Sequence, residues 1–183
     1  MVEEIIFAGF GGQGVLSMGQ TLAYASMLQG KNVSWMPSYG PEMRGGTANC
    51  ITIISNETIS SPIVSRFDTA VVLNQPSMEK FGEKVKPNGV LIYEATNILK
   101  VVDRKDIEIY PIPAAEEANK LNNTKVTNMV LLGAYLERKP LVNIDAIIDA
   151  LKKVLPERYH HLLAVNKEAL TIGGKIMKSL MAK

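Results

Sequence analysis

The 183-residue sequence has an ordinary globular composition, with 46% hydrophobic and 21% charged residues, and its 20 basic and 18 acidic side chains leave a net charge of +2. That length predicts one domain over residues 1–183. The nearly equal numbers of basic and acidic side chains argue against nucleic acid as a partner. No apolar run approaches the roughly 18 residues that span a bilayer, and the acidic start, Met1-Val2-Glu3-Glu4, does not resemble a signal peptide. We therefore expect a cytoplasmic protein without membrane contacts.

Strand and helix patterns alternate along the chain. Short apolar runs predict strands over residues 4–8, 32–36, 47–54, 68–73, 90–93 and 107–112. Helical periodicity predicts helices over residues 15–29, 76–85, 114–121, 128–138, 144–154 and 157–181, the last with an apolar stripe through Leu162, Val165, Ala169, Ile172, Ile176 and Leu180. Residues 38–46 and 86–89 are expected to be a loop and a turn, and Asn56-Glu57 a hairpin tip from which residues 58–61 return. This order predicts an α/β protein: three-layer α/β/α, with a Rossmann-like, mostly parallel sheet and an added antiparallel hairpin.

A glycine-rich turn follows the first predicted strand and precedes the first helix. It has the G-x-G-x-x-G spacing, and its candidate binding residues are Gly9, Gly11, Gly12, Gln13 and Gly14. Glycines allow close approach of the backbone, and the helix start offers N–H groups to an anion. A dinucleotide site would also need an acidic residue at the end of the second strand, where the sequence has Trp35-Met36-Pro37-Ser38. The turn therefore favours a phosphate-bearing cofactor or a partner subunit, with close helix–strand packing as the alternative.

A second loop concentrates unusual residues. Its candidate partner- or substrate-adjacent residues are Tyr39, Gly40, Pro41, Glu42, Arg44, Gly45 and Gly46. In a doubly wound sheet this loop would lie at the same edge as the glycine turn, where ligands bind. Arg44 could hold a carboxylate or phosphate through two hydrogen bonds, and the alternative is an ion pair with Glu42 that has no function.

The remaining polar residues do not form a recognisable catalytic site. The single cysteine, Cys50, excludes an internal disulfide and a cysteine-ligated zinc or iron–sulfur site within this chain, and it is expected to be a buried small side chain. His160 and His161 are adjacent, so they are not expected to share a helix face as metal ligands. No G-x-S-x-G, H-E-x-x-H or P-loop motif occurs. The sequence thus predicts neither catalytic nor metal-binding residues.

Three segments together resemble the gamma subunit of 2-oxoacid:ferredoxin oxidoreductases. They are Phe7–Gly14 (FAGFGGQG), Ser38–Gly46 (SYGPEMRGG) and Asn128–Ala134 (NMVLLGA), in the order in which the family has them. The second segment looks most like the 2-oxoglutarate type. A gamma-type subunit of a pyruvate, 2-oxoisovalerate or indolepyruvate oxidoreductase is the first alternative, and a standalone dinucleotide-binding oxidoreductase is the second.

The resemblance implies a role within a larger enzyme. Such a complex converts a 2-oxoacid and coenzyme A to an acyl-CoA and carbon dioxide, and it reduces ferredoxin. It uses thiamine diphosphate, bound between alpha and beta subunits, and iron–sulfur clusters in the beta subunit or a ferredoxin-like delta subunit. The gamma chain is expected to pack on the thiamine-binding subunits, and it could help to hold coenzyme A.

Overall fold

The computed structural model describes residues 1–38 and 47–183. One six-stranded sheet organises the chain. Its strands are β1 (Val2–Phe10), β2 (Asn32–Ser38), β3 (Thr47–Ser55), β4 (Phe67–Val72), β5 (Val85–Glu94) and β6 (Glu108–Ile112), in the spatial order β2-β3-β1-β4-β5-β6. The pairs β1–β4, β4–β5 and β5–β6 are parallel, whereas β3 is antiparallel to both β1 and β2. The expected mostly parallel sheet with an antiparallel addition is confirmed.

The antiparallel part is built differently from the expected hairpin. Residues 58–61 form no strand, so the predicted return after Asn56-Glu57 is wrong. Instead β2 pairs with β3, from Asn32 opposite Ser55 to Ser38 opposite Asn49. A strand over residues 58–61 would have had to displace one of the two strands that already flank β3.

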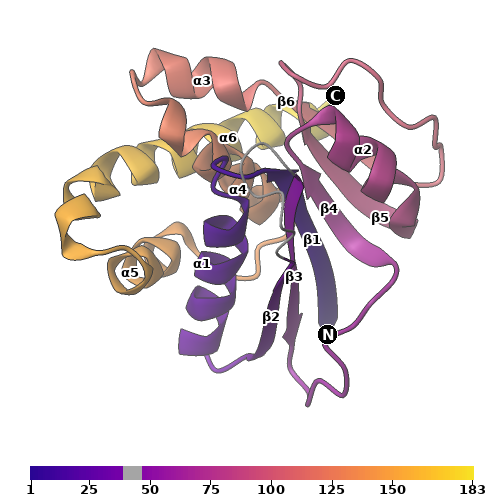
Figure 1. Ribbon diagram of the computed structural model, residues 1–183, viewed down its shortest axis with the longest axis horizontal. Helices are drawn as coiled ribbons and strands as arrows, with labels where there is room; N and C mark the ends of the chain where they lie inside the picture. The colour runs from indigo at the N-terminus through magenta and orange to yellow at the C-terminus, as the bar shows by residue number, and fades with distance from the viewer. Residues whose placement is uncertain (39–46) are drawn as a thin grey trace.

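The helices cover the two faces of the sheet unequally. On one face lie α1 (Val15–Leu28), α3 (Ala114–Lys120), α4 (Thr127–Arg138), α5 (Ile144–Val154) and α6 (Leu163–Met181), while α2 (Gln75–Phe81) alone covers part of the other (Figure 1). Short 3₁₀ turns at Gly82–Lys84, Thr124–Val126 and Glu157–Leu162 join these elements. The expected three layers are present, but nearly all of the helical mass lies on the α1 side.

The predicted turn at residues 86–89 is a bulge within β5. Val85 pairs with Phe67 and Val90 with Thr69, so five steps along β5 match two along β4. Asn88 takes a left-handed conformation (φ 63°), and its N–H donates to the carbonyl oxygen of Asp106 at 2.7 Å. The turn-forming residues therefore loop outward from a strand that continues beyond them.

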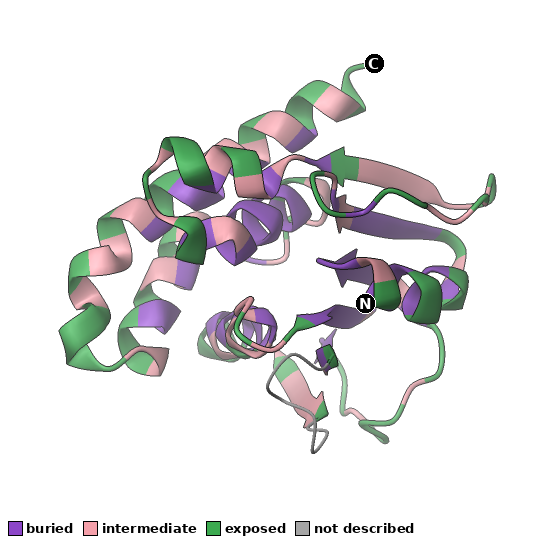
Figure 2. Cartoon of the chain, turned by 45° about the horizontal axis from the view of Figure 1, so that its top comes forward, coloured by how far each residue is buried: buried purple, intermediate pink, exposed green. Residues whose placement is uncertain are grey.

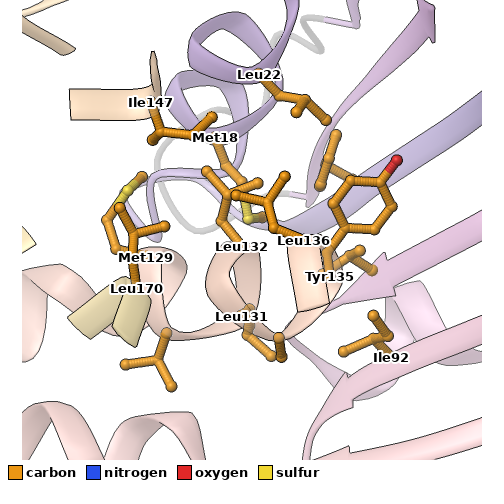
Figure 3. Packing of buried hydrophobic residues seen from close by; sticks show 14 of the residues in the cluster. Met18, Leu22, Ile92, Met129, Leu131, Leu132, Tyr135, Leu136, Ile147 and Leu170 are labelled. Carbon is orange, nitrogen blue, oxygen red and sulfur yellow. The ribbon is translucent and has the colours of Figure 1, made fainter. Parts of the chain in front are cut away.

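Helix α4 is the centre of the larger core. Every residue from Asn128 to Leu136 is buried, and the ribbon is purple along most of its length (Figure 2). Its side chains meet Met18 and Leu22 of α1, Ile147 of α5 and Ile92 of the sheet (Figure 3). The Tyr135 ring packs edge-on against Phe7, with ring centroids 6.2 Å apart. This burial on all sides agrees with the apolar sequence of the helix.

Two glycines bring α4 and α6 into backbone contact. A Cβ atom on Gly133 would overlap the carbonyl of Leu170, and one on Gly173 would overlap the carbonyl of Val130. The buried residues of α6 are Asn166, Ala169, Leu170, Gly173 and Met177. Of the expected stripe only Ala169 is fully buried, because the close contact at Gly173 turns the helix so that Ile172 and Ile176 lie at its margin.

A salt bridge joins the end of α4 to the edge strand β6. The Arg138 guanidinium donates to Glu108 through Nε at 2.7 Å, and the Tyr110 hydroxyl donates to the same carboxylate at 2.6 Å. These hydrogen bonds lower the pKa of Glu108 from 4.5 to about 2, and the bond from Arg138 has the largest effect.

None of the described helices is both long and apolar enough to cross a membrane.

We expect Gly173→Ala to lower the free energy of unfolding by about 2–3 kcal/mol, because the new methyl group must push α4 and α6 apart. Gly174→Ala is the matched control, since its Cβ would lie no closer than 3.7 Å to any atom outside its own turn. The control should be neutral or more stable by up to about 1 kcal/mol, through its higher helix propensity. Urea unfolding of both variants checks this, and equal stabilities would contradict the close contact.

The depressed pKa of Glu108 predicts a pH-dependent contribution to stability. Since its folded pKa lies below its ordinary value, the contribution is present above pH 4.5 and is lost as the pH falls towards 2. The side chain is 42% exposed, so we expect only about 1 kcal/mol after screening by solvent. Chemical denaturation between these pH values should show a shallower decline for Glu108→Gln than for the wild type. Glu57→Gln, at an exposed carboxylate that forms no ion pair within the described residues, should leave the decline unchanged.

Candidate functional site at the carboxyl edge of the sheet

The glycine loop, defined here as Gly9–Gly14, connects β1 to α1 at the carboxyl edge of the parallel strands. A Cβ on Gly9 would lie 2.6 Å from Oε1 of Gln13 and 2.9 Å from Val15. Gly12 and Gly14 have φ of 93° and 74°, which side chains rarely adopt. Gly9 is therefore needed for packing, and the other two are needed for the path of the backbone.

Gln13 holds the loop closed. Its side-chain Oε1 accepts the N–H of Phe10 at 2.6 Å, while its own N–H donates to the carbonyl of Phe10 at 3.2 Å. Because its acceptor is used inside the loop, Gln13 is first of all a positioning residue. Gly11 and Gly12 line a shallow cavity of about 250 Å³ beside Phe10 and Ala48.

The first turn of α1 is open to an anion. Its N-cap, Gly14, has no side chain to accept the free N–H groups, and the turn contains no acidic residue. The unpaired N–H groups and the helix dipole give such a start a partial positive charge. An anion site at this turn remains a prediction from the sequence.

Helix α4 contacts the glycine loop directly. The Asn128 amide donates through Nδ2 to the carbonyl oxygen of Gly14 at 3.1 Å, and a Cβ on Gly14 would collide with that amide. The first and third of the three segments singled out in the sequence therefore meet, although 114 residues separate Gly14 and Asn128.

Beside the loop is a cavity of about 200 Å³, which we call the cradle. It is lined by Gly12, Gln13, Asn97, Ala115, Thr124, Lys125 and Thr127. Lys125 is exposed and forms no ion pair with a described residue. It also borders a second, apolar cavity of about 310 Å³, which Gly14 and Asn128 line as well. The Thr127 hydroxyl already donates to the carbonyl oxygen of Thr124 at 2.9 Å. The Lys125 ammonium group, the Thr124 hydroxyl and a glycine backbone around one small space can bind a phosphate.

A buried carboxylate shapes one wall of the cradle. Glu94, the last residue of β5, is 1% exposed and accepts the N–H groups of Asn97 at 2.9 Å and Ala115 at 3.1 Å. Both bonds hold backbone segments that line the cradle. Neither Glu94 nor Lys125 was predicted from the sequence, although Glu94 directly follows the predicted strand 90–93, at the edge where ligands bind.

The second predicted loop lies outside the described residues, so its candidates, Tyr39, Gly40, Pro41, Glu42, Arg44, Gly45 and Gly46, remain predictions. The residues on either side of it are placed. Ser38 ends β2, and Thr47 begins β3 opposite Phe10 of β1. Both therefore lie at the edge that carries the glycine loop.

The sheet order weakens the dinucleotide alternative. In a dinucleotide-binding fold the second strand lies next to the first and places an acidic residue beside the ribose. Here β3 separates β2 from β1.

Within residues 1–38 and 47–183, no three His, Cys, Asp or Glu side chains are placed to share a metal ion. Cys50 is buried beneath α1, where burial raises its pKa to about 12.

Comparison with known proteins identifies the family. The model for "Pyruvate ferredoxin/flavodoxin oxidoreductase" matches residues 4–176. The chain belongs to this family. The resemblance found in the sequence is thereby confirmed.

Individual relatives differ in length and in the substrate they are named for. Ketoisovalerate oxidoreductase subunit VorA of Methanothermobacter thermautotrophicus is 43% identical over 133 residues, which are 73% of this chain but only 28% of the relative. 2-Oxoglutarate synthase subunit KorC of Methanothermobacter marburgensis is 34% identical over 163 residues, or 85% of this chain and 88% of the relative. The chain thus spans little more than a quarter of VorA but nearly all of KorC.

The fold is also found in a solved gamma subunit. The keto/oxoacid ferredoxin oxidoreductase gamma subunit of Geobacter sulfurreducens superposes with a TM-score of 0.81 at 27% identity, covering 97% of this chain and 99% of that subunit. This likeness confirms the α/β fold class predicted from the sequence.

Proposed function

We propose that this chain is the gamma subunit of a 2-oxoglutarate:ferredoxin oxidoreductase, which converts 2-oxoglutarate and coenzyme A to succinyl-CoA and carbon dioxide. The observation that supports 2-oxoglutarate as the substrate is the match to KorC, which covers 85% of this chain and 88% of KorC. In this proposal the chain packs on alpha and beta subunits that bind thiamine diphosphate. Iron–sulfur clusters, in the beta subunit or a delta subunit, pass electrons to ferredoxin.

We further propose that the cradle and the glycine loop help to hold a phosphate group of coenzyme A. The open first turn of α1, the ammonium group of Lys125 and the hydroxyl group of Thr124 are suited to a phosphate. The bound coenzyme supplies a thiol that accepts the acyl group. The contribution of this chain is to bind and orient the coenzyme, while the second loop would meet a partner subunit or the substrate.

A second candidate substrate is 2-oxoisovalerate. It is favoured by the identity to VorA, which at 43% exceeds the 34% identity to KorC. That match covers one part of a much longer relative, so it reports on this domain more than on the substrate-binding subunits.

The substrate can be tested on the complex purified from the native cell under mild conditions. We expect co-elution with thiamine-binding and cluster-binding chains, together with coenzyme A-dependent reduction of a viologen dye that is faster with 2-oxoglutarate than with pyruvate or 2-oxoisovalerate. Faster reduction with 2-oxoisovalerate would select the second candidate. Elution as a lone chain that binds NAD or flavin would contradict both.

The cradle can be tested in the assembled enzyme with Lys125→Ala. Loss of one ammonium–phosphate contact should raise the KM for coenzyme A about three- to tenfold and leave kcat almost unchanged. Lys120→Ala is the matched control, because Lys120 is also exposed and pairs with Glu117 outside the cradle. An unchanged KM for coenzyme A in Lys125→Ala would refute this role of the cradle.

A further inference from the structure

The opposite edge of the sheet contains a separate cavity. It lies at the amino ends of the parallel strands, has a volume of about 560 Å³ and is lined by residues of β1, β5 and the segment after α4. Small-molecule sites range from about 300 to 1,000 Å³, so this space is large enough for a small ligand. Neither the glycine loop nor the cradle contributes to its lining. We call it the amino-edge cavity.

Three lysines from distant parts of the chain converge on this cavity. Lys86 binds Glu4 at 2.6 Å and Asp68 at 2.8 Å, and Lys139 binds Glu3 at 3.2 Å. The Lys31 ammonium group has a neutral partner, the side-chain oxygen of Asn56 at 2.6 Å, and forms no ion pair with a described carboxylate. Of these three lysines, Lys31 is therefore the one whose charge is available to a ligand.

The walls of the cavity are fixed by the fold. Glu3 is 5% exposed and is held by the Thr69 hydroxyl at 2.6 Å as well as by Lys139. Gly89 packs so closely that a Cβ would lie 2.7 Å from the Lys86 carbonyl and 2.8 Å from that of Asp68. The close packing at Gly89 thus fixes the backbone of the β5 bulge at the cavity wall before any ligand arrives, which lowers the cost of binding.

The remaining lining limits the kind of ligand. Val2, Pro87, Pro140 and Leu141 provide apolar surface. The carboxylates of Glu3 and Asp68 also line the space and would repel a second negative charge. One lysine without a carboxylate partner, an apolar wall and two carboxylates suit a ligand that has a single negative charge and a short apolar body.

We propose that the amino-edge cavity binds a small monocarboxylate whose carboxylate pairs with Lys31 and whose apolar body packs on Pro140 and Leu141. This site is separate from the coenzyme site proposed above, so the two can fail independently. It gives the subunit a place where a small acid binds far from the cradle.

The test uses isovalerate, acetate and glutarate as probes, titrated into the isotope-labelled full chain and followed by NMR. We expect saturable shifts of the Lys31, Gly89 and Leu141 amides with a Kd of about 1 mM for isovalerate. Acetate should bind about three- to tenfold more weakly because it lacks the apolar body. Glutarate should be weaker than isovalerate because its second carboxylate meets Glu3 and Asp68.

Two further experiments test the amino-edge cavity: substitution of Lys31, and titration of the assembled complex with isovalerate. Lys31→Gln should weaken isovalerate binding at least about threefold, whereas Lys120→Gln, at an exposed lysine outside the cavity, should not. Absence of saturable shifts up to about 10 mM isovalerate, or equal binding by Lys31→Gln, would overturn the proposal. Loss of isovalerate binding by calorimetry in the assembled complex would also overturn it, because a partner subunit would then fill the cavity.

Discussion

The backbone contact between α4 and α6 is the constraint on which the site edge depends. Gly133 and Gly173 remove the side chains that would separate the two helices. α4 can then lie buried among α1, α6 and the sheet, with its first turn at the end of β1 (Figure 1). Only in that position does Asn128 reach the carbonyl of Gly14. A packing requirement in the middle of the helical layer thus fixes the conformation of a loop at its rim.

The charged groups are arranged differently at the two edges of the sheet. Around the cradle, the described groups are mostly backbone N–H groups and neutral side chains, with Lys125 as the exposed charge. The buried Glu94 is satisfied by backbone N–H groups, so its charge is used to hold the wall and does not face a cation there. At the amino edge, lysines and carboxylates are paired across β1, β4 and β5. Among the described residues, the carboxyl edge thus has a lysine without a carboxylate partner beside backbone donors, whereas most of the charges at the amino edge are paired with one another.

Much of this arrangement was predictable from local sequence. The strand–glycine–helix succession over residues 4–29 requires particular backbone angles, and the apolar run from Met129 to Leu136 requires burial. The glycine turn and the buried helix were therefore predicted correctly. The errors were of another kind. Strand pairing depends on contacts distant in sequence, so the partner of β3 was β2, not residues 58–61. Lys86-Pro87-Asn88-Gly89 has turn chemistry, but register with β4 and the bond from Asn88 to Asp106 decide that it bulges from a strand. Lys125 carries no local motif, and only the tertiary fold brings it to the glycine loop.

The same domain occurs alone and within longer chains, and the packing explains how it tolerates both. KorC and the Geobacter sulfurreducens gamma subunit are covered almost completely by this chain, whereas VorA contains the matched region as 28% of its length. A domain that is stable only through a neighbour would need to expose part of its core when separated. Here the large side chains of α4 are enclosed by elements of the same chain, as the labelled residues around Tyr135 show (Figure 3). The described core that positions the glycine loop and the cradle is therefore formed by contacts within this chain.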